Sequence, residues 1–287
     1  MDQGPSLLTS WSFNPLQLAP TAIIAYLYAR RVRTLRSHGV DVPGWRIWSF
    51  ALGISLAVFA LVSPVDVLGE ERFLFMHMIQ HIILGDLAPL FFVLGLTGPI
   101  LRPVLALPGV GRLRILAHPL VALPFWAINL YIWHLPVLYE AAIHHDAVHA
   151  LEHFLFFTGG VLIWAAVFET LPGPAWFGTG AKLGFVVVVR VLEAVLGNIF
   201  IWSGTVFYST YDVTGRRWGL SPLGDQGLAG AIMMVEGSIV TIVVLAWLFL
   251  RLASEGELRQ QLLERGVDPR AARRAVRYGR ADILNTR

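Results

Sequence analysis

The sequence has no cysteine and, for its 287 residues, few charged side chains. The missing thiols exclude disulfides, thiolate metal sites and cysteine-bound iron–sulfur clusters. Only 14% of the residues are charged, against about 25% in a typical soluble domain, while 56% are hydrophobic and the mean hydropathy is +0.64. This composition predicts a polytopic membrane protein in which any metal is bound through imidazole, carboxylate or thioether groups.

Seven apolar segments approach the roughly 20 residues that a transmembrane helix needs. They cover residues 13–31, 45–62, 73–97, 119–134, 147–168, 181–204 and 226–251. We therefore expect an all-α integral membrane protein with seven transmembrane helices in residues 1–252, followed by a basic cytoplasmic tail in residues 253–287. The N-terminal stretch "MDQGPSLLTSW" lacks the basic region and cleavage site of a signal peptide, so we expect the first span to be retained. In the tail, Asp268 followed by Pro269 predicts the start of a short helix.

Basic residues are distributed unevenly between the two ends of these segments. The loops after the first, third and fifth segments and the C-terminal tail hold 18 lysines and arginines, whereas the opposite loops hold three. Because these residues accumulate in cytoplasmic loops, the N-terminus is expected outside and the C-terminus in the cytoplasm. The net charge of +3 follows from this rule and does not indicate nucleic-acid binding. The tail arginines are suited instead to anionic lipid headgroups.

A few charged residues lie inside the apolar segments. Arg190 and Glu193 are three residues apart in the sixth segment, and Asp86 and Glu236 lie within the third and seventh. An unpaired charge is costly at the middle of a membrane. We therefore interpret this group as structural charge pairing rather than as a proton path.

Two histidine pairs stand in the stretches "HMIQH" (His77 and His81) and "HALEH" (His149 and His153). Residues four apart share one face of a helix. With the predicted orientation, a rise of 1.5 Å per residue places the pairs about 8–13 Å and about 5–10 Å from the outer ends of their helices. If these two faces turn toward each other, four imidazoles meet at one depth, enough to hold one or two metal ions.

A single histidine in a membrane helix is commonly a hydrogen-bonded packing residue, but grouped ionisable residues usually mark a functional site. His134 ends the fourth segment at the same predicted outer surface. Imidazole binds zinc, copper, iron and nickel, and thioethers shift the preference toward Cu(I). Met233 and Met234 fall near the histidine layer, although methionines at such positions also serve in packing. Neither pair has the H-E-x-x-H pattern of a zinc protease.

Three stretches resemble the multi-spanning CtaG-type cytochrome c oxidase assembly factors. They are "HMIQHIILGDLAPLFFVLG", "HPLVALPFWAINLYIWHLPVLYEAAIHHDAVHALEHFLFF" and "DQGLAGAIMMVEG", in that order. The resemblance implies a multi-pass protein of the bacterial plasma membrane, not an enzyme, that supports the maturation of a haem–copper oxidase through copper delivery. The family's metal-binding candidates fall on His77, His81, His134, His149, His153, Asp225, Met233 and Met234. The family often has tryptophan where this chain has Met234, which is a departure from the pattern.

The expected cofactor is copper, and the expected partners are cytochrome c oxidase subunits, a periplasmic copper chaperone, membrane lipid and a second copy of the chain. Two other functions compete with copper delivery. One is a haem-binding electron-transfer protein, because histidines on two helices also serve as axial haem ligands. The other is a copper transporter or copper-resistance protein, although a transporter needs ligands at successive depths and these histidines stop in the outer half.

Overall fold

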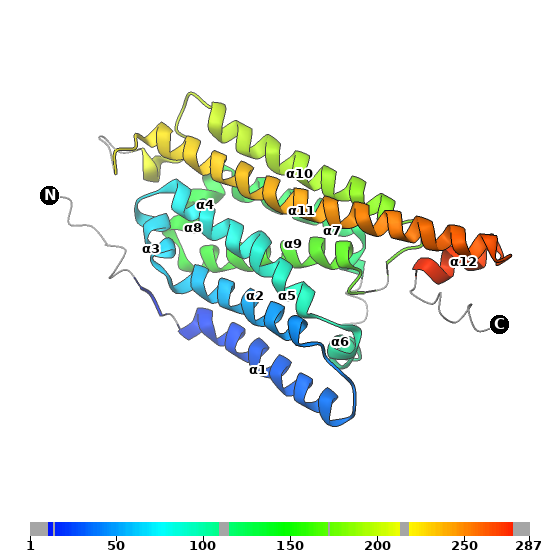
Figure 1. Ribbon diagram of the computed structural model, residues 1–287. Helices are drawn as coiled ribbons and strands as arrows, with labels where there is room; N and C mark the ends of the chain where they lie inside the picture. The colour runs from blue at the N-terminus through cyan, green and yellow to red at the C-terminus, as the bar shows by residue number, and fades with distance from the viewer. Residues whose placement is uncertain (1–10, 14, 109–114, 172, 213–217, 278–287) are drawn as a thin grey trace. The chain divides into compact units, whose positions relative to one another are not determined.

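The computed structural model describes residues 11–13, 15–108, 115–171, 173–212 and 218–277, and this part is mostly helical (Figure 1). Its helices are α1 Pro15–Ser37, α2 Gly44–Val62, α3 Pro64–Glu71, α4 Leu74–Ile82, the π-helical turn η1 Ile83–Leu87, α5 Ala88–Gly95, α6 Gly98–Leu105, α7 Pro119–Trp133, α8 Pro136–His144, α9 Asp146–Phe168, α10 Thr179–Trp202, the short 3-10 turn η3 Ser209–Tyr211, α11 Pro222–Glu264 and α12 Pro269–Arg277. Each of the seven predicted segments coincides with a helix or a continuous run of helices, which confirms the all-α class.

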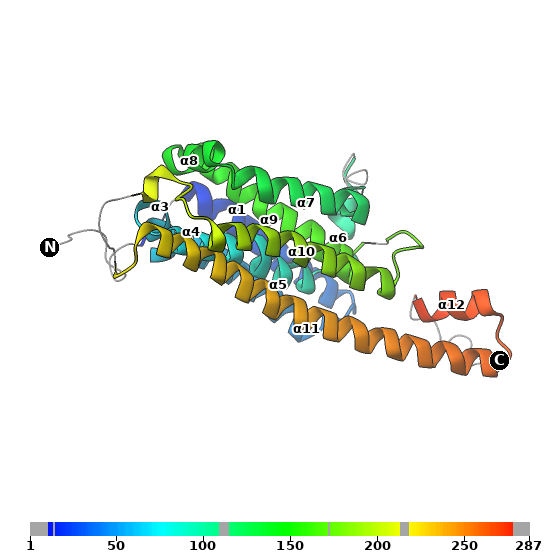
Figure 2. The same ribbon diagram turned by 90° about the horizontal axis from the view of Figure 1, so that it is seen from above.

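Five helical stretches are long and apolar enough to cross a membrane. They are α2, the continuous stretch Leu74–Gly95, α9, α10 and α11. Helices α7 and α8 add a sixth if they form one span bent by 75°, and Figure 2 shows α8 beside one end of α7. Within the described residues, α1 does not meet the same test, and its C-terminal third carries four arginines. These helices are those of a multi-pass membrane protein, while the count of seven spans and their orientation stay predictions.

The chain divides into two compact units. The first comprises Met1–Gly173 and Leu192–Glu236 and contains every residue predicted to bind metal. The second comprises Pro174–Val191 and Gly237–Arg287.

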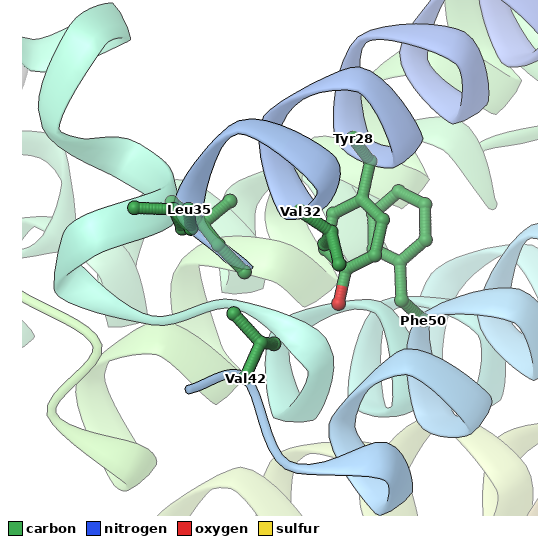
Figure 3. Close-up of a cluster of buried hydrophobic side chains, with 6 residues drawn as sticks. Tyr28, Val32, Leu35, Val42 and Phe50 are labelled. Carbon is green, nitrogen blue, oxygen red and sulfur yellow. The ribbon is translucent and has the colours of Figure 1, made fainter. Parts of the chain in front are cut away.

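Aromatic and aliphatic side chains from α1 and α2 pack together in the first unit (Figure 3). The Tyr28 ring stacks on Phe50 with centroids 3.6 Å apart. Val32 and Leu35 from α1 and Val42 from the following loop belong to the same buried cluster. This cluster holds α1 against α2.

The histidine-bearing helices meet where α9 lies against the π-helical turn. Gly160 of α9 lies so close to the Gly85 carbonyl and the Pro89 ring that a Cβ at position 160 would overlap both. Pro89 has no N–H to donate to the Gly85 carbonyl, so an α-helical bond is missing there. The backbone forms a π-helical turn instead, in which the Ala88 N–H donates to the Ile83 carbonyl. This turn brings α9 beside the helical stretch that carries the first histidine pair.

The second unit contains the predicted tail helix. Helix α12 starts at Pro269, and the Asp268 carboxylate accepts hydrogen bonds of 3.0 Å from the N–H groups of Arg270 and Ala271. This confirms the predicted start of a helix. Helix α11 continues without interruption to Glu264, so the seventh segment and the first part of the tail form one helix.

Candidate metal centre

Helices α4 and α9 bring the two histidine pairs together. The rings of His77 and His149 stack with centroids 5.4 Å apart, and those of His81 and His153 meet edge to face at 5.8 Å. All four side chains are buried, and His77 is completely so. These contacts confirm the prediction that the two H-x-x-x-H faces turn toward each other.

Three of these histidines and one carboxylate offer ligand atoms that all lie within 4.8 Å of one another. The four residues are His77, His81, His149 and Glu152. We call them the histidine group. Four atoms that share one ion at bond lengths of about 2.0–2.2 Å lie closer together than this limit, so binding would draw the four side chains inward. Three imidazole nitrogens and one carboxylate oxygen form a donor set that suits copper, zinc or iron.

The histidine group has donors and acceptors that the protein does not use. Among the described residues, neither ring nitrogen of His77 or His81 has a hydrogen-bond partner, and neither does either carboxylate oxygen of Glu152, whose nearest approach to His81 is 3.6 Å. Buried polar atoms are nearly always hydrogen-bonded, since an unsatisfied one destabilises the fold. This concentration of unsatisfied atoms therefore fits a group that binds a cation.

Glu70 of α3 orients one member of the group. Its Oε1 lies 2.6 Å from His149 Nδ1, so this ring nitrogen donates the hydrogen bond and Nε2 keeps its lone pair free for a ligand. Glu70 is 37% exposed, whereas His149 is buried, so the carboxylate links the histidine group to the surface. The sequence analysis did not identify Glu70, because nothing in the local pattern of α3 indicates its contact with α9.

A second carboxylate, that of Asp66, connects helix α3 to α4 through a hydrogen bond. Asp66 accepts hydrogen bonds from Gln80 Nε2 at 2.5 Å and from the Ser12 hydroxyl at 3.3 Å. Burial and the nearby Glu70 charge raise the pKa of Asp66 to about 6, so it is largely ionised at neutral pH and acts as an acceptor. Gln80 lies between the two histidines of α4 in sequence, and this bond therefore positions α3 over the histidine group.

Three buried tyrosines cover the same face. The Tyr139 ring lies edge to face with His77 at 5.0 Å and stacks on Tyr208 at 3.8 Å. The Tyr139 and Tyr211 hydroxyls are 3.0 Å apart, and Tyr211 donates to the Gly69 carbonyl. These rings exclude water from the histidine group, and the sequence analysis did not identify them.

His134 lies beside the histidine group without belonging to it. Its ring is 6.2 Å from that of His81, and its Nδ1 donates to the Leu130 carbonyl at 2.7 Å. Its Nε2 is buried and has no hydrogen-bond partner in the described part of the chain. Nε2 is therefore the nitrogen that can bind a ligand.

The three remaining predicted residues lie apart from the histidine group. The Asp225 carboxylate accepts from the N–H groups of Leu74 and Phe75 at 2.8 and 3.0 Å, so it caps the helix that carries His77 and His81. Met234 lies against α10, with its sulfur 3.7 Å from Asn198 Nδ2. Met233 lines a cavity next to His81 and His134. The structure thus brings His77, His81 and His149 into one group, with His153 and His134 beside it, and leaves the predicted thioethers and Asp225 outside the group.

Comparison with known proteins gives a family match over most of the chain. The family described as "Cytochrome c oxidase caa3 assembly factor (Caa3_CtaG)" matches residues 26–255. The chain is also 26% identical over 268 residues to "Uncharacterized protein Mb0105" of Mycobacterium bovis and to "Uncharacterized protein MT0111" of Mycobacterium tuberculosis. The match covers 85% of this chain but only 40% of each relative. No solved structure matches.

Proposed function

The chain belongs to the family of cytochrome c oxidase caa3 assembly factors, and from this premise we propose that it binds copper at the histidine group and delivers it to the oxidase. The role is that of an assembly factor rather than an enzyme. Copper is the cargo, held for a time and passed on. The partners are cytochrome c oxidase subunits, which receive the metal, and a periplasmic copper chaperone, which supplies it.

The observation that carries this proposal is the set of unsatisfied donors in the histidine group. Imidazole nitrogens of His77 and His81 and the Glu152 carboxylate have no hydrogen-bond partner among the described residues, and they lie within 4.8 Å of one another. Glu152 is completely buried, so a bound cation would stabilise its ionised form where solvent does not. Because these atoms have no partner without a cation, binding a cation stabilises the group. Glu70, which is 37% exposed and contacts His149, gives a cation access from the surface.

The direction of delivery follows from the predicted topology. With seven spans, the N-terminus outside and the C-terminus in the cytoplasm, the histidine group lies toward the extracytoplasmic side of the bacterial plasma membrane. A donor or acceptor in the periplasm then reaches it without the metal crossing the bilayer. This placement distinguishes delivery from inward copper transport.

The test compares a double variant, His77→Ala with His149→Ala, with the deletion strain and with the wild type. Removing two donors of the histidine group is expected to weaken copper binding by the purified protein at least about tenfold. Even residues that only orient the ligands contribute 10- to 100-fold to metal affinity. Oxidase activity in membranes from cells grown at limiting copper should fall to the level of the deletion.

The matched control is His144→Ala with His145→Ala, which removes two exposed histidines from the end of α8 and the start of α9. This variant should retain both copper binding and oxidase activity. All variants must accumulate in the membrane at similar amounts. Full oxidase activity in the His77 and His149 variant at limiting copper would exclude delivery and leave a scaffolding role.

An absorbance spectrum of the purified wild type with a haem Soret band would favour the haem-binding alternative.

A further inference from the structure

A cavity lies next to the histidine group in the first unit. It has a volume of about 60 Å³, and the residues around it include Met78, His81, Asp86, His134, Glu193, Met233 and Glu236. A site needs about 10–15 Å³ to hold one water molecule, so this cavity has room for a cation or a few waters. Most of its wall is apolar, and ionisable side chains within candidate membrane spans are costly unless they have a function.

The cavity offers softer ligands than the histidine group does. Met78 is almost fully buried on α4, and Met233 comes from α11. His134 is 92% buried, its Nδ1 is engaged with the Leu130 carbonyl, and its Nε2 has no hydrogen-bond partner among the described residues. Two thioethers and an imidazole nitrogen form a donor set that favours Cu(I) over harder cations.

Three carboxyl groups lie at this cavity, those of Asp86, Glu193 and Glu236. Asp86 and Glu236 are hydrogen-bonded to each other. Trp164 Nε1 donates to Asp86 Oδ1 at 2.8 Å, which fixes that side chain at the π-helical turn. Negative charge on such groups in an apolar region is compensated by a bound cation.

We propose that this cavity is a second metal site, selective for a soft cation, with Met78, Met233 and His134 as ligands and the carboxyl groups of Asp86, Glu193 and Glu236 as counter-charge. This second site rests on the proposed function only in that Cu(I) is taken as its natural cation. His81 borders both the cavity and the histidine group, so a cation that leaves the histidine group reaches the cavity by exchange at His81.

The test uses the full chain purified in detergent and Ag(I) as a redox-inert probe for Cu(I). Bound Ag(I) is counted by elemental analysis after gel filtration, and sulfur ligands are detected by X-ray absorption at the silver edge. The variant Met78→Leu with Met233→Leu should lose one equivalent of Ag(I) and the sulfur scattering. Met234→Leu is the matched control, because that neighbouring thioether lies against Asn198 instead, and it should behave as the wild type.

A second variant tests the counter-charge. Glu236→Gln replaces one of the three carboxyl groups by a neutral amide and should weaken Ag(I) binding by about tenfold or more, since charges interact strongly in a medium of low dielectric constant. Unchanged affinity would contradict the role assigned to Glu236.

The outcomes separate this proposal from the proposed function. Sulfur scattering that persists in the Met78 and Met233 variant, or that disappears in Met234→Leu, overturns the second site even if the histidine group binds copper. Sulfur-bound Ag(I) that survives in His77→Ala with His149→Ala supports the second site, whether or not the histidine group delivers copper.

Discussion

At the scale of single residues, most side chains around the histidine group act by orienting other residues. Glu70 fixes the ring of His149 through its Nδ1, and Asp225 caps the helix that carries His77. Gly69 has no side chain because a Cβ there would lie 2.9 Å from the His77 backbone. The geometry of the ligands therefore depends on residues that bind no metal themselves.

Glu70→Gln is expected to weaken copper binding by about tenfold, because the partner of a ligating histidine typically contributes 10- to 100-fold to metal affinity. The neutral amide accepts a hydrogen bond from His149 less strongly than the carboxylate, so the ring is held less firmly. Competition titration with a copper chelator measures the change. Glu71→Gln, at the exposed neighbouring position, is the control. Equal loss in both variants would mean that surface charge, and not the contact with His149, sets the affinity.

At the scale of helices, the candidate metal centre depends on how closely α9 approaches the π-helical turn. Pro89 has no N–H for an α-helical bond at this turn, and Gly160 lets the two backbones meet. Small residues allow membrane helices to pack closely in the same way in general. The contact sets the distance between the helices that carry the two histidine pairs.

Gly160→Ala is expected to destabilise the first unit by about 1–3 kcal/mol, the usual effect of overpacking. The added methyl group would overlap the Gly85 carbonyl and the Pro89 ring, neither of which can rotate away. A lower midpoint of thermal unfolding in detergent, together with weaker copper binding, is the measurable result. Gly227→Ala is the matched control, since a Cβ there meets nothing within 4 Å, and alanine favours a helix over glycine. If Gly160→Ala unfolds at the temperature of the wild type, the close approach of α9 is not required.

At the scale of the whole molecule, the side of the membrane that the site faces depends on the number and direction of the membrane crossings. Five helical stretches meet the length and hydropathy expected of a span, and the bent pair α7 and α8 makes a sixth if it is one span. Helix α1 covers the first predicted span, and its arginines belong to the asymmetry on which the orientation depends. The site faces the periplasm only if that orientation holds.

The absence of native cysteine allows a direct test of this topology. His145→Cys and Ser254→Cys place single thiols at exposed positions that are predicted to lie outside and inside, respectively. A membrane-impermeant maleimide should label position 145 in intact cells and position 254 only after permeabilisation. Labelling of both positions in intact cells would contradict the predicted orientation and, with it, periplasmic delivery.

Much of the architecture and part of the site followed from the sequence, because their signals are local. A helix in a membrane satisfies its own backbone hydrogen bonds over about 20 apolar residues, so the length of an apolar run identifies a span. The spacing of His77 and His81, and of His149 and His153, places each pair on one face. These features need only neighbouring residues and the bilayer as solvent.

Only the tertiary structure could decide which of these faces meet and what surrounds them. Glu70 and Tyr139 act through contacts between helices that are distant in sequence, and no local pattern indicates them. The sequence marked Asp86 and Glu236 as charges within spans, but not their contact with each other. For the same reason Met233 and Met234, adjacent in sequence, have different surroundings: successive residues point about 100° apart around a helix, so one lines the cavity and the other contacts α10. Composition and spacing determined which groups are available to bind copper, and the packing of α4, α9 and α11 decided which of them converge.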